Sequence, residues 1–600
     1  MPNLDFDRLI AGWRGPVIAA FIAFLAGLPG LIAMPPLDRD ESRFAQASAQ
    51  MLESDNYIDI RFQDEARHKK PVGIYWLQAA SVAALSSEDA RQIWAYRVPS
   101  LLGAMLAAAA CAWGAMAFFG ARGGLIAGLV LGCSMMLSTE AFIAKTDAAL
   151  CGSVTLAMAA LGRLYADARA GVPLRRRHKL IFWIALGVSI LIKGPIGPMV
   201  AGLCMLTLGV WDRNAVWIKR LGWGWGLLIV LLIVGPWAMA ITVATNGGFW
   251  GKAVGGDFGS KLVGGQESHG APPGYYLLLL PLLLYPATVL LPAAFGTGWT
   301  RRFAPGVRFA VAWLIPCWFV FELVPTKLPH YTLPLYGGLA WLLAATLTPA
   351  PTEALETGPM PRWLEAVFAR LGSAGRAMRD APWSEIGVWL GLALGLLAAG
   401  VIGAAAVLGL RLYGDPGDVV WTSLTVGFVV VGFAVAAFFV LNRARMAALL
   451  VSCVFGVLAH TALVMGLAPN LKPLWVSRNV ARQLDRSGLD PRNGITPGPV
   501  ATLGYSEPSL IFLLGTETEI LDAEDAVAAV AQGRPVLVEQ KMEPRFRAEL
   551  ARQQVSVQAV SITNGVNYSR GRPVSITLYR LRGLPKTPPA PAGPAPGPTR

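Results

Sequence analysis

Charged residues are scarce in this chain of 600 residues. Asp, Glu, Lys and Arg together make up 15% of it, and hydrophobic residues make up 54%. A soluble globular protein carries about 25% charged residues, so this chain lacks the polar side chains needed to cover a soluble body of its size. The composition therefore excludes a wholly soluble protein and places much of the chain in a lipid bilayer.

Cysteine is also rare, with six residues, and none of them stands in a CxxC or other metal-ligand spacing. This spacing excludes a zinc ribbon and gives no sign of a disulfide framework. Each cysteine lies in an apolar run, so we expect all six to be small core residues. They are Cys111, Cys133, Cys151, Cys204, Cys317 and Cys453.

Acids are fewer than bases, which gives a net charge of +14. No basic stripe is interleaved with exposed aromatic residues, so we expect no nucleic-acid partner. Membrane proteins collect Lys and Arg on cytoplasmic loops, and that bias accounts for the charge.

Thirteen apolar runs are candidates for membrane-spanning helices, each of which needs about 20 residues. The first run ends at Met34-Pro35-Pro36 without a small-x-small cleavage site, so we expect an uncleaved helix. Pro195 separates two crowded runs, and 120–124 separates two others. The approximate centres are Phe24, Ala107, Leu131, Met158, Leu186, Leu203, Val230, Leu283, Ile315, Leu339, Leu397, Val429 and Phe455.

The basic loops predict an orientation. With a cytoplasmic N-terminus, the loops after helices four, six, eight and twelve are rich in Arg and Lys, as the positive-inside rule requires. The loop after helix ten is the exception, because its acids and bases nearly balance. The loop 35–91 then faces outward, with ten acids against seven bases, and an odd helix count places the C-terminal segment outside as well.

The chain changes character after residue 469. Strand patterns at 500–504, 519–521, 536–539, 555–562 and 575–580 alternate with helix patterns at 507–514, 525–532 and 543–554. We therefore predict a polytopic α-helical membrane domain over 1–469, a small periplasmic α/β domain over 470–583, and a disordered Pro- and Ala-rich tail over 584–600.

The outward loop 35–91 carries a dense set of chemical groups. Asp40 and Glu41 lie near its start, Lys69 and Lys70 near its end, and 42–52 can form a short amphipathic helix in the interface plane. The alternative is a solvated acidic loop that only joins two helices.

Further charges stand at the outer ends of helices. They are Lys145, Asp147, Lys193, Lys327 and His330. Snorkelling lysines would explain any one of them, but one topology brings all of them to the same face. Cations there could bind a lipid-linked phosphate leaving group, and a carboxylate could position or deprotonate an acceptor.

Six motifs in these regions carry a resemblance. They are Asp40-Glu41-Ser42-Arg43-Phe44-Ala45, Lys70-Pro71-Val72-Gly73-Ile74-Tyr75-Trp76, Tyr96-Arg97-Val98-Pro99-Ser100, Thr146-Asp147, Lys193-Gly194-Pro195 and Lys327-Leu328-Pro329-His330-Tyr331-Thr332-Leu333-Pro334-Leu335-Tyr336. With these motifs the chain resembles the polyprenyl-phosphate-sugar glycosyltransferases of the GT-C type. Within the protein O-mannosyltransferase superfamily it is most similar to the bacterial aminoarabinose transferases of lipid A.

The resemblance implies an inverting enzyme of the bacterial inner membrane with a periplasmic site. It assigns catalytic roles to Asp40, Glu41 and Asp147, and donor-phosphate binding to Lys70, Lys193, Arg43 and Lys69. It assigns the substrate cavity to Tyr75, Arg97, Lys327, His330 and Tyr331. Two positions depart from the pattern: Lys69 stands where the aminoarabinose transferases have Glu, which leaves the sugar open, and Val72 replaces the second Pro.

The expected partners are a polyprenyl-phosphate-linked sugar, membrane lipids, and lipid A, the lipopolysaccharide core or another periplasmic acceptor. A protein O-mannosyltransferase-like enzyme is the alternative within the same class. A lipid or solute transporter is the alternative from another class, but it would favour charges near the middle of the bilayer and two related halves. No cofactor is required by the sequence. A divalent metal stays open, with His68, His269 and His330 as outer-face candidates.

Overall fold

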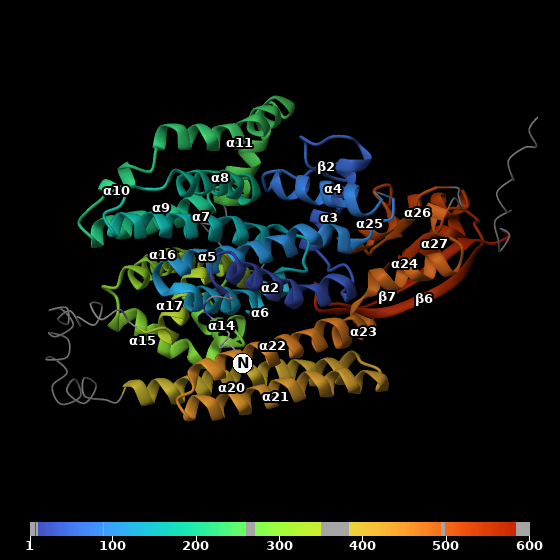
Figure 1. The fold of residues 1–600 in the computed structure, drawn as a ribbon. Coiled ribbons are helices and arrows are strands. Elements are labelled where there is room, and N and C mark those ends of the chain that lie inside the picture. The colour runs from blue at the N-terminus through green and yellow to red at the C-terminus, as the bar shows by residue number, and fades with distance from the viewer. Residues whose placement is uncertain are drawn as a thin grey trace, which may run out of the picture.

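The chain folds into a bundle of long helices with an α/β unit at one end (Figure 1). The computed structural model describes residues 7, 10–87, 89–259, 270–349, 383–493 and 498–583. Eight helices in these ranges are long and apolar enough to cross a membrane, or nine if a bent pair counts as one span. The chain is therefore a multi-pass membrane protein, and the predicted tail 584–600 lies outside the described residues.

The bundle contains helices of very different length. The long ones are α2 (Arg14–Ala33), α5 (Ile93–Gly132), α7 (Thr146–Arg169), α8 (Arg176–Lys193), α9 (Ile196–Trp211), α11 (Trp223–Ala244), α16 (Pro305–Leu323), α20 (Trp383–Tyr413), α21 (Val419–Leu441) and α22 (Arg445–Thr461). Shorter elements join them: α6 (Met135–Glu140), α10 (Val216–Lys219), α12 (Gly248–Trp250), η1 (Gly251–Gly259), α14 (Tyr275–Leu283), η2 (Ala287–Leu290), α15 (Leu291–Thr300), η3 (Pro329–Leu335), α17 (Tyr336–Leu347), η5 (Pro416–Asp418), η6 (Ala462–Leu467), α23 (Ala468–Asn470) and η7 (Lys472–Leu474).

Every one of the thirteen predicted centres falls in a helix, but the number of long spans is smaller. Helix α5 contains two of the centres and is broken at Gly120, whose φ of 68° is a conformation that favours glycine. Its second half packs back on the first: a Cβ on Gly128 would lie 2.9 Å from the Ala108 carbonyl oxygen. Helices α14 and α15 form the bent pair, at 118°, and α17 has only 12 residues.

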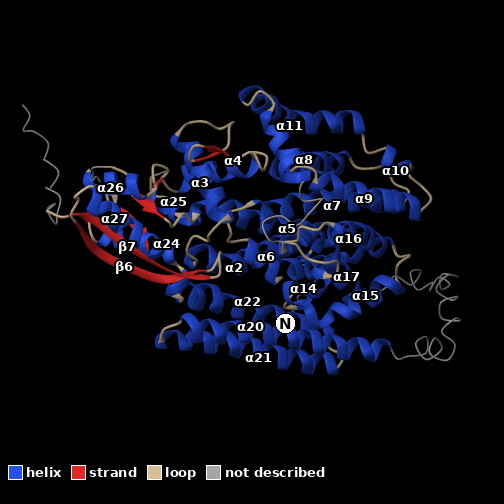
Figure 2. Cartoon of the chain, turned by 180° about the vertical axis from the view of Figure 1, so that it is seen from behind, coloured by secondary structure: helices blue, strands red, loops and turns tan. Residues whose placement is uncertain are grey.

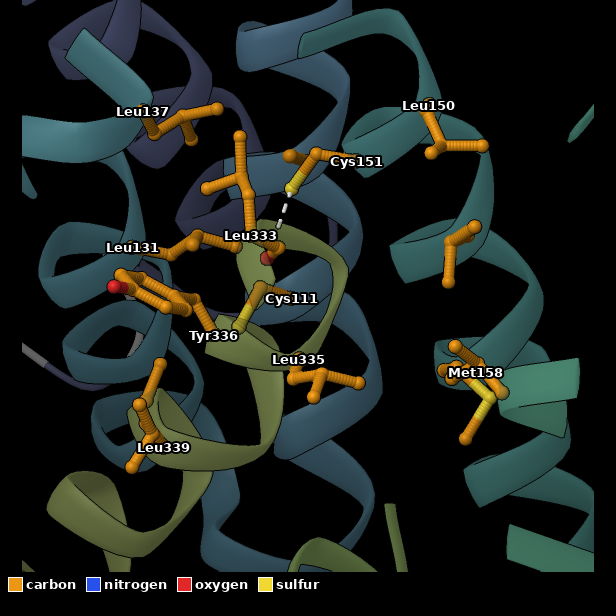
Figure 3. Packing of buried hydrophobic residues seen from close by; sticks show 14 of the residues in the cluster. Cys111, Leu131, Leu137, Leu150, Cys151, Met158, Leu333, Leu335, Tyr336 and Leu339 are labelled. Atoms are coloured by element: carbon orange, nitrogen blue, oxygen red, sulfur yellow. Dashed lines mark hydrogen bonds between the residues drawn. The ribbon is translucent and has the colours of Figure 1, made fainter. Parts of the chain in front are cut away.

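The core of the bundle is apolar and includes the cysteines. Figure 3 shows Cys111 of α5 and Cys151 of α7 beside Leu333 and Tyr336, which belong to η3 and α17. The Cys151 Sγ lies 3.7 Å from the Leu333 carbonyl oxygen. All six cysteines are free and buried, which confirms the prediction that they are core residues.

The segment after α2 forms a small layer over one end of the bundle. It contains α3 (Asp40–Glu53), a two-stranded hairpin of β1 (Arg61–Phe62) and β2 (Glu65–Ala66), and α4 (Gly73–Leu85). The predicted helix over 42–52 is confirmed. However, its apolar residues Phe44, Ala47 and Met51 are buried within the protein and do not lie on a lipid surface.

The α/β unit follows the last long helix. Its sheet has the order β4-β3-β5-β7-β6, with parallel pairs around β3 and antiparallel pairs around β7. The elements are α24 (Val476–Arg486), η8 (Pro491–Asn493), β3 (Ala501–Leu503), α25 (Pro508–Leu514), β4 (Glu519–Ile520), α26 (Ala523–Ala531), β5 (Val536–Glu539), η9 (Gln540–Met542), α27 (Glu543–Arg552), β6 (Val557–Asn567) and β7 (Arg572–Leu581). The five strands and three helices predicted for this stretch are all present.

The two ends of the bundle differ. The α/β unit lies beside α3 and α4 at one end, while α10 and the turn between α15 and α16 lie at the other (Figures 1 and 2). We call the first the α/β end. The opposite end holds the loops rich in Arg and Lys, between α7 and α8 and between α9 and α11. The separation agrees with the charge pattern of the sequence.

Candidate functional site

Five charged or titratable side chains contact one another inside the bundle, toward the α/β end. We call them the buried charge cluster: Glu140, Lys145, Asp147, Lys193 and His330. They come from α6, the start of α7, the end of α8 and η3. The Lys145 Nζ lies 3.0 Å from Glu140 Oε1 and 3.7 Å from Asp147 Oδ2. The Lys193 Nζ donates to Asp147 Oδ1.

His330 and Tyr331 complete this group. The His330 Nδ1 lies 3.1 Å from Lys145 Nζ, and its Nε2 lies 3.7 Å from Asp147 Oδ2. The Lys193 ammonium stands 5.2 Å from the centre of the Tyr331 ring, within the range of a cation–π contact. Three of the predicted motifs therefore meet at one point, although they are spread over residues 146–336 of the sequence.

Helix ends place these charges favourably. Asp147 lies in the first turn of α7, and Lys193 lies in the last turn of α8. The dipole of a helix stabilises an acid at its start and a base at its end. Gly194 follows with a φ of 66° and ends α8, so Lys193 is the last helical residue of α8.

Glu140 belongs to the cluster although none of the six sequence motifs includes it. It is 2% exposed, and its Oε2 has no hydrogen-bond partner among the described residues. Burial raises the pKa of Glu140 to about 7. The signal was present in the sequence, because Glu140 is an acid within an otherwise uncharged stretch only five residues before Lys145.

Lys145 remains a cation in this environment. Burial by itself lowers the pKa of its ammonium, but the Glu140 and Asp147 carboxylates raise it, and the net change is upward. Asp40 is among the charges that contribute to this rise, so its carboxylate shares the electrostatic field of the cluster. Asp40 itself is exposed at the start of α3, and no side-chain hydrogen bond caps that helix.

Glu41 and Arg97 form a buried ion pair. The guanidinium donates to both carboxylate oxygens of Glu41, at 2.8 Å each, and to the carbonyl oxygens of Met34 and Pro35. Glu41 also accepts from the backbone N–H of Ala144. The pair ties the end of α2, the start of α3 and the segment before α7 together, and Arg97 has no exposed surface.

Two further predicted cavity residues are buried supports. Tyr75 is fully buried, packs on the Phe44 ring at 5.3 Å, and its hydroxyl accepts from Arg67. The Lys327 Nζ donates to the carbonyl oxygens of Glu322 and Val324, so it satisfies the end of α16. In the structure, polar atoms of Tyr75, Arg97 and Lys327 therefore bind protein groups, and the assignment of these residues to the substrate cavity stays a prediction.

The cationic side chains of the loop 35–91 lie in two different places: beside a cleft next to the α/β unit, and near the contact between α4 and α8. Arg43 and Lys69 line a cleft of about 1110 Å³ between this loop and the α/β unit, together with Arg39, Arg67, Glu507 and Arg570. Lys70 is half-buried, three residues before Gly73. A Cβ on Gly73 would lie 2.7 Å from the Leu191 carbonyl oxygen, so the start of α4 packs closely on the end of α8. This contact brings the segments of Lys70 and Lys193 together.

The α/β unit is attached to the first loop by hydrogen bonds. Ser509 donates to the Asp38 carboxylate, and the Asp38 backbone N–H donates to Tyr568 at 2.7 Å. Burial raises the pKa of Asp38 to about 6. Arg91 adds a second contact, because its guanidinium binds Glu53 and donates to Thr516 at 2.9 Å.

The structure gives a different result for each of the three histidines that the sequence suggested as metal ligands. His269 lies outside the described residues. His68 binds Asp59 at 2.7 Å, away from the buried charge cluster. His330 lies within it, where single ligand atoms of Glu140, Asp147 and His330 are all within 4.8 Å of one another.

Comparison with known proteins supports a common fold. No protein-family model matches the chain. It is 28% identical over 331 residues to the undecaprenyl phosphate-alpha-4-amino-4-deoxy-L-arabinose arabinosyl transferase of Pseudomonas paraeruginosa, a match that covers 53% of this chain and 58% of the relative. The protein of the same name from Pectobacterium atrosepticum is 27% identical over 364 residues, covering 59% of this chain and 63% of the relative. The chain thus spans about three fifths of the length of these curated relatives.

The structural likeness extends further than the sequence match. The crystal structure of ArnT from Cupriavidus metallidurans bound to undecaprenyl phosphate superimposes with a TM-score of 0.69 and 20% identity, and covers 95% of this chain and 98% of that one. Its apo state gives the same TM-score over 94% and 97%. The chain has the fold of these aminoarabinose transferases, and the resemblance carried by the six motifs is confirmed.

Proposed function

We propose that this chain is an inverting glycosyltransferase of the bacterial inner membrane that transfers a sugar from a polyprenyl-phosphate donor to lipid A, the lipopolysaccharide core or another periplasmic acceptor. One observation carries the proposal: three motifs of that enzyme class converge at one end of the bundle. The residues that meet there are Lys193, Asp147, His330 and Tyr331. The names of the curated relatives, which include the donor undecaprenyl phosphate, support the donor class.

The donor phosphate is both the anchor and the leaving group of this reaction. Lys193 and Lys70 are proposed to neutralise it, because cations placed where negative charge develops lower the barrier. Arg43 and Lys69 extend the positive surface toward the cleft beside the α/β unit. Lys193 is already fixed by Asp147, so the protein needs little reorganisation when the phosphate arrives.

The acceptor side is assigned to Asp40. A hydroxyl acceptor must lose a proton as the glycosidic bond forms, and a positioned carboxylate can accept it. Asp40 is exposed and lies close enough to the cluster to affect Lys145. The geometry favours a positioning role for Glu41 and Asp147, because Glu41 is paired with Arg97 and Asp147 with Lys193.

The position of the charges also favours an enzyme over a transporter. A transporter would favour charged groups near the middle of the bilayer, at broken helices of two related halves. Here the cluster joins helix ends beside the first loop. A protein O-mannosyltransferase-like reaction uses the same chemistry with another acceptor, and the experiment below separates the two.

The test is a comparison of cell-envelope glycans. Mass spectrometry of lipid A and core oligosaccharide would be performed on a deletion strain, on the strain complemented with the wild type, and on one complemented with Asp40→Asn. The expected result is one glycosyl unit that is present only with the wild type. Unchanged lipid A and core, together with a lost glycosyl unit on periplasmic proteins, would instead support the O-mannosyltransferase-like alternative.

A further inference from the structure

Lys145 occupies the centre of the buried charge cluster. Its Nζ lies 3.0 Å from Glu140, 3.1 Å from His330 and 3.7 Å from Asp147. The side chain is 9% exposed, and the residue stands in an extended conformation just before α7, which directs it inward. No motif of the sequence resemblance includes Lys145.

Lys145 also determines which nitrogen of the His330 ring carries the proton. An ammonium group can only donate hydrogen bonds, so the His330 Nδ1 at 3.1 Å must be the acceptor. The ring proton is then on Nε2, which faces Asp147 Oδ2 at 3.7 Å. Lys145 therefore orients His330 toward the same carboxylate that holds Lys193.

The three groups around Lys145 are of the kind that bind divalent cations. Two carboxylates and an imidazole are suitable ligands for Zn²⁺ or Mn²⁺, and their ligand atoms all lie within 4.8 Å of one another. Glu140 has a second oxygen that is buried and lacks a hydrogen-bond partner among the described residues. Such an oxygen is one that a small multivalent cation could bind.

We propose that Lys145 is a positioning residue of the candidate site, and that its ammonium stands where Glu140, Asp147 and His330 would otherwise bind a divalent cation. The built-in ammonium keeps Asp147 and His330 in place and adds a fixed positive charge beside Lys193. The catalytic role of Lys145 rests on the function proposed above. The occupation of the metal position by Lys145 does not depend on that function, so an experiment can contradict either statement without the other.

The direct test measures bound metal in the purified full chain. The proteins would be dialysed against Zn²⁺ or Mn²⁺ and analysed for metal content. The set consists of wild type, Lys145→Ala, Lys145→Arg and the double variant Lys145→Ala/His330→Ala. Lys145→Ala should bind one equivalent more than wild type, and the double variant should lose it. Lys145→Arg should resemble wild type, because arginine keeps a cation in the cluster. Lys472→Ala is the matched control, since Lys472 forms an exposed pair with Asp415.

Two outcomes would overturn the proposal: no additional metal in a folded Lys145→Ala protein, or one equivalent in wild type that His330→Ala removes. The comparison of wild type with His330→Ala requires no Lys145 variant, so a misfolded Lys145→Ala protein would not leave the proposal without a test.

Sugar transfer, measured on the same preparations, gives the functional part. Transfer by the wild type should be insensitive to a chelator. Lys145→Ala should lower kcat by about 100-fold or more, the effect of losing one preorganised charge, with substantial recovery in Lys145→Arg or on addition of Mn²⁺. If kcat is unchanged while metal is gained, the lysine fills a metal position without a role in the reaction, and the positioning role is overturned. If no preparation transfers sugar, the proposed function fails while the metal result stands.

Discussion

At the scale of single residues, the charge of Asp40 is the feature most directly tied to the proposed chemistry. Asp40→Asn keeps the size of the side chain, and no side-chain cap of α3 is lost. We expect transfer to a hydroxyl acceptor to fall by about 100-fold or more, because a general base contributes 10²–10⁴ to the rate. Thermal stability in detergent should be unchanged.

Asp55→Asn is the matched control for this change. Asp55 is exposed in the same loop and has a φ of 51°, which asparagine adopts well. Transfer should stay near the wild-type rate in this variant. Near-normal turnover of Asp40→Asn would make Asp40 a structural residue and shift the assignment of the base to another carboxylate.

Lys70 permits a second test at this scale. Lys70→Ala should lower kcat by about 10²–10³, the effect of removing one preorganised donor from a developing anion. The half-buried side chain is not part of the buried charge cluster, so the protein should still insert and purify normally. Steady-state transfer in proteoliposomes would check this, with Lys472→Ala as control. Wild-type turnover in Lys70→Ala would refute the phosphate-binding role.

At the scale of elements, the contact between α4 and α8 aligns the two cationic segments. Gly73→Ala adds a methyl group 2.7 Å from the Leu191 carbonyl oxygen, so the start of α4 must move. Overpacking of this kind costs about 1–3 kcal/mol. We expect a lower melting temperature in detergent together with reduced transfer, because Lys70 moves relative to Lys193.

Gly202→Ala provides the comparison for that variant. Gly202 lies in α9, and a Cβ there has open space within 4 Å. Its stability should be equal to or slightly above that of the wild type, since alanine favours a helix more than glycine does. Equal melting temperatures of Gly73→Ala and Gly202→Ala would show that the close contact is not needed.

The sequence predicted the elements better than their lengths. Apolar composition located all thirteen helix centres, and period-two patterns located the strands of the α/β unit. It also separated the two halves of α5 at 120–124, where the structure has its break at Gly120, but it could not show that α14 and α15 form a bent pair, because that bend depends on packing. In the candidate site, sequence motifs identified Lys193 and Asp147. Glu140 belongs to no motif, and the packing of α6 brings it into contact with Lys145.

At the scale of the whole molecule, the α/β unit and the Asp40 loop lie at the same end of the bundle. A reporter fused after residue 583 should therefore be active only outside the cytoplasm, in agreement with the basic loops at the opposite end. A fusion in the loop between α7 and α8 should give the reverse result. Activity of the C-terminal fusion only in the cytoplasm would contradict the orientation of the proposed site.

The attachment of the α/β unit should respond to pH. The pKa of Asp38 is raised to about 6 in the folded protein from 3.8, so the folded state holds this proton more tightly than the unfolded state. Its contribution to stability is then fully present below about pH 4 and is lost as the pH rises through 6. Melting curves between pH 4 and 7 should show this loss, and Asp38→Asn should reduce it. An identical slope in Asp38→Asn would exclude Asp38 as the cause.

The same attachment has a consequence for biosynthesis. Asp38 and Arg39 bind Tyr568 and Ser569, which lie 530 positions later in the chain. At about 5–20 residues per second, the ribosome needs roughly half a minute to two minutes to make the intervening segment. The loop that carries Asp40 is thus among the first parts of the protein to be translated, but its hydrogen bonds to the C-terminal unit can form only when synthesis is nearly complete. A nascent or truncated chain therefore lacks them.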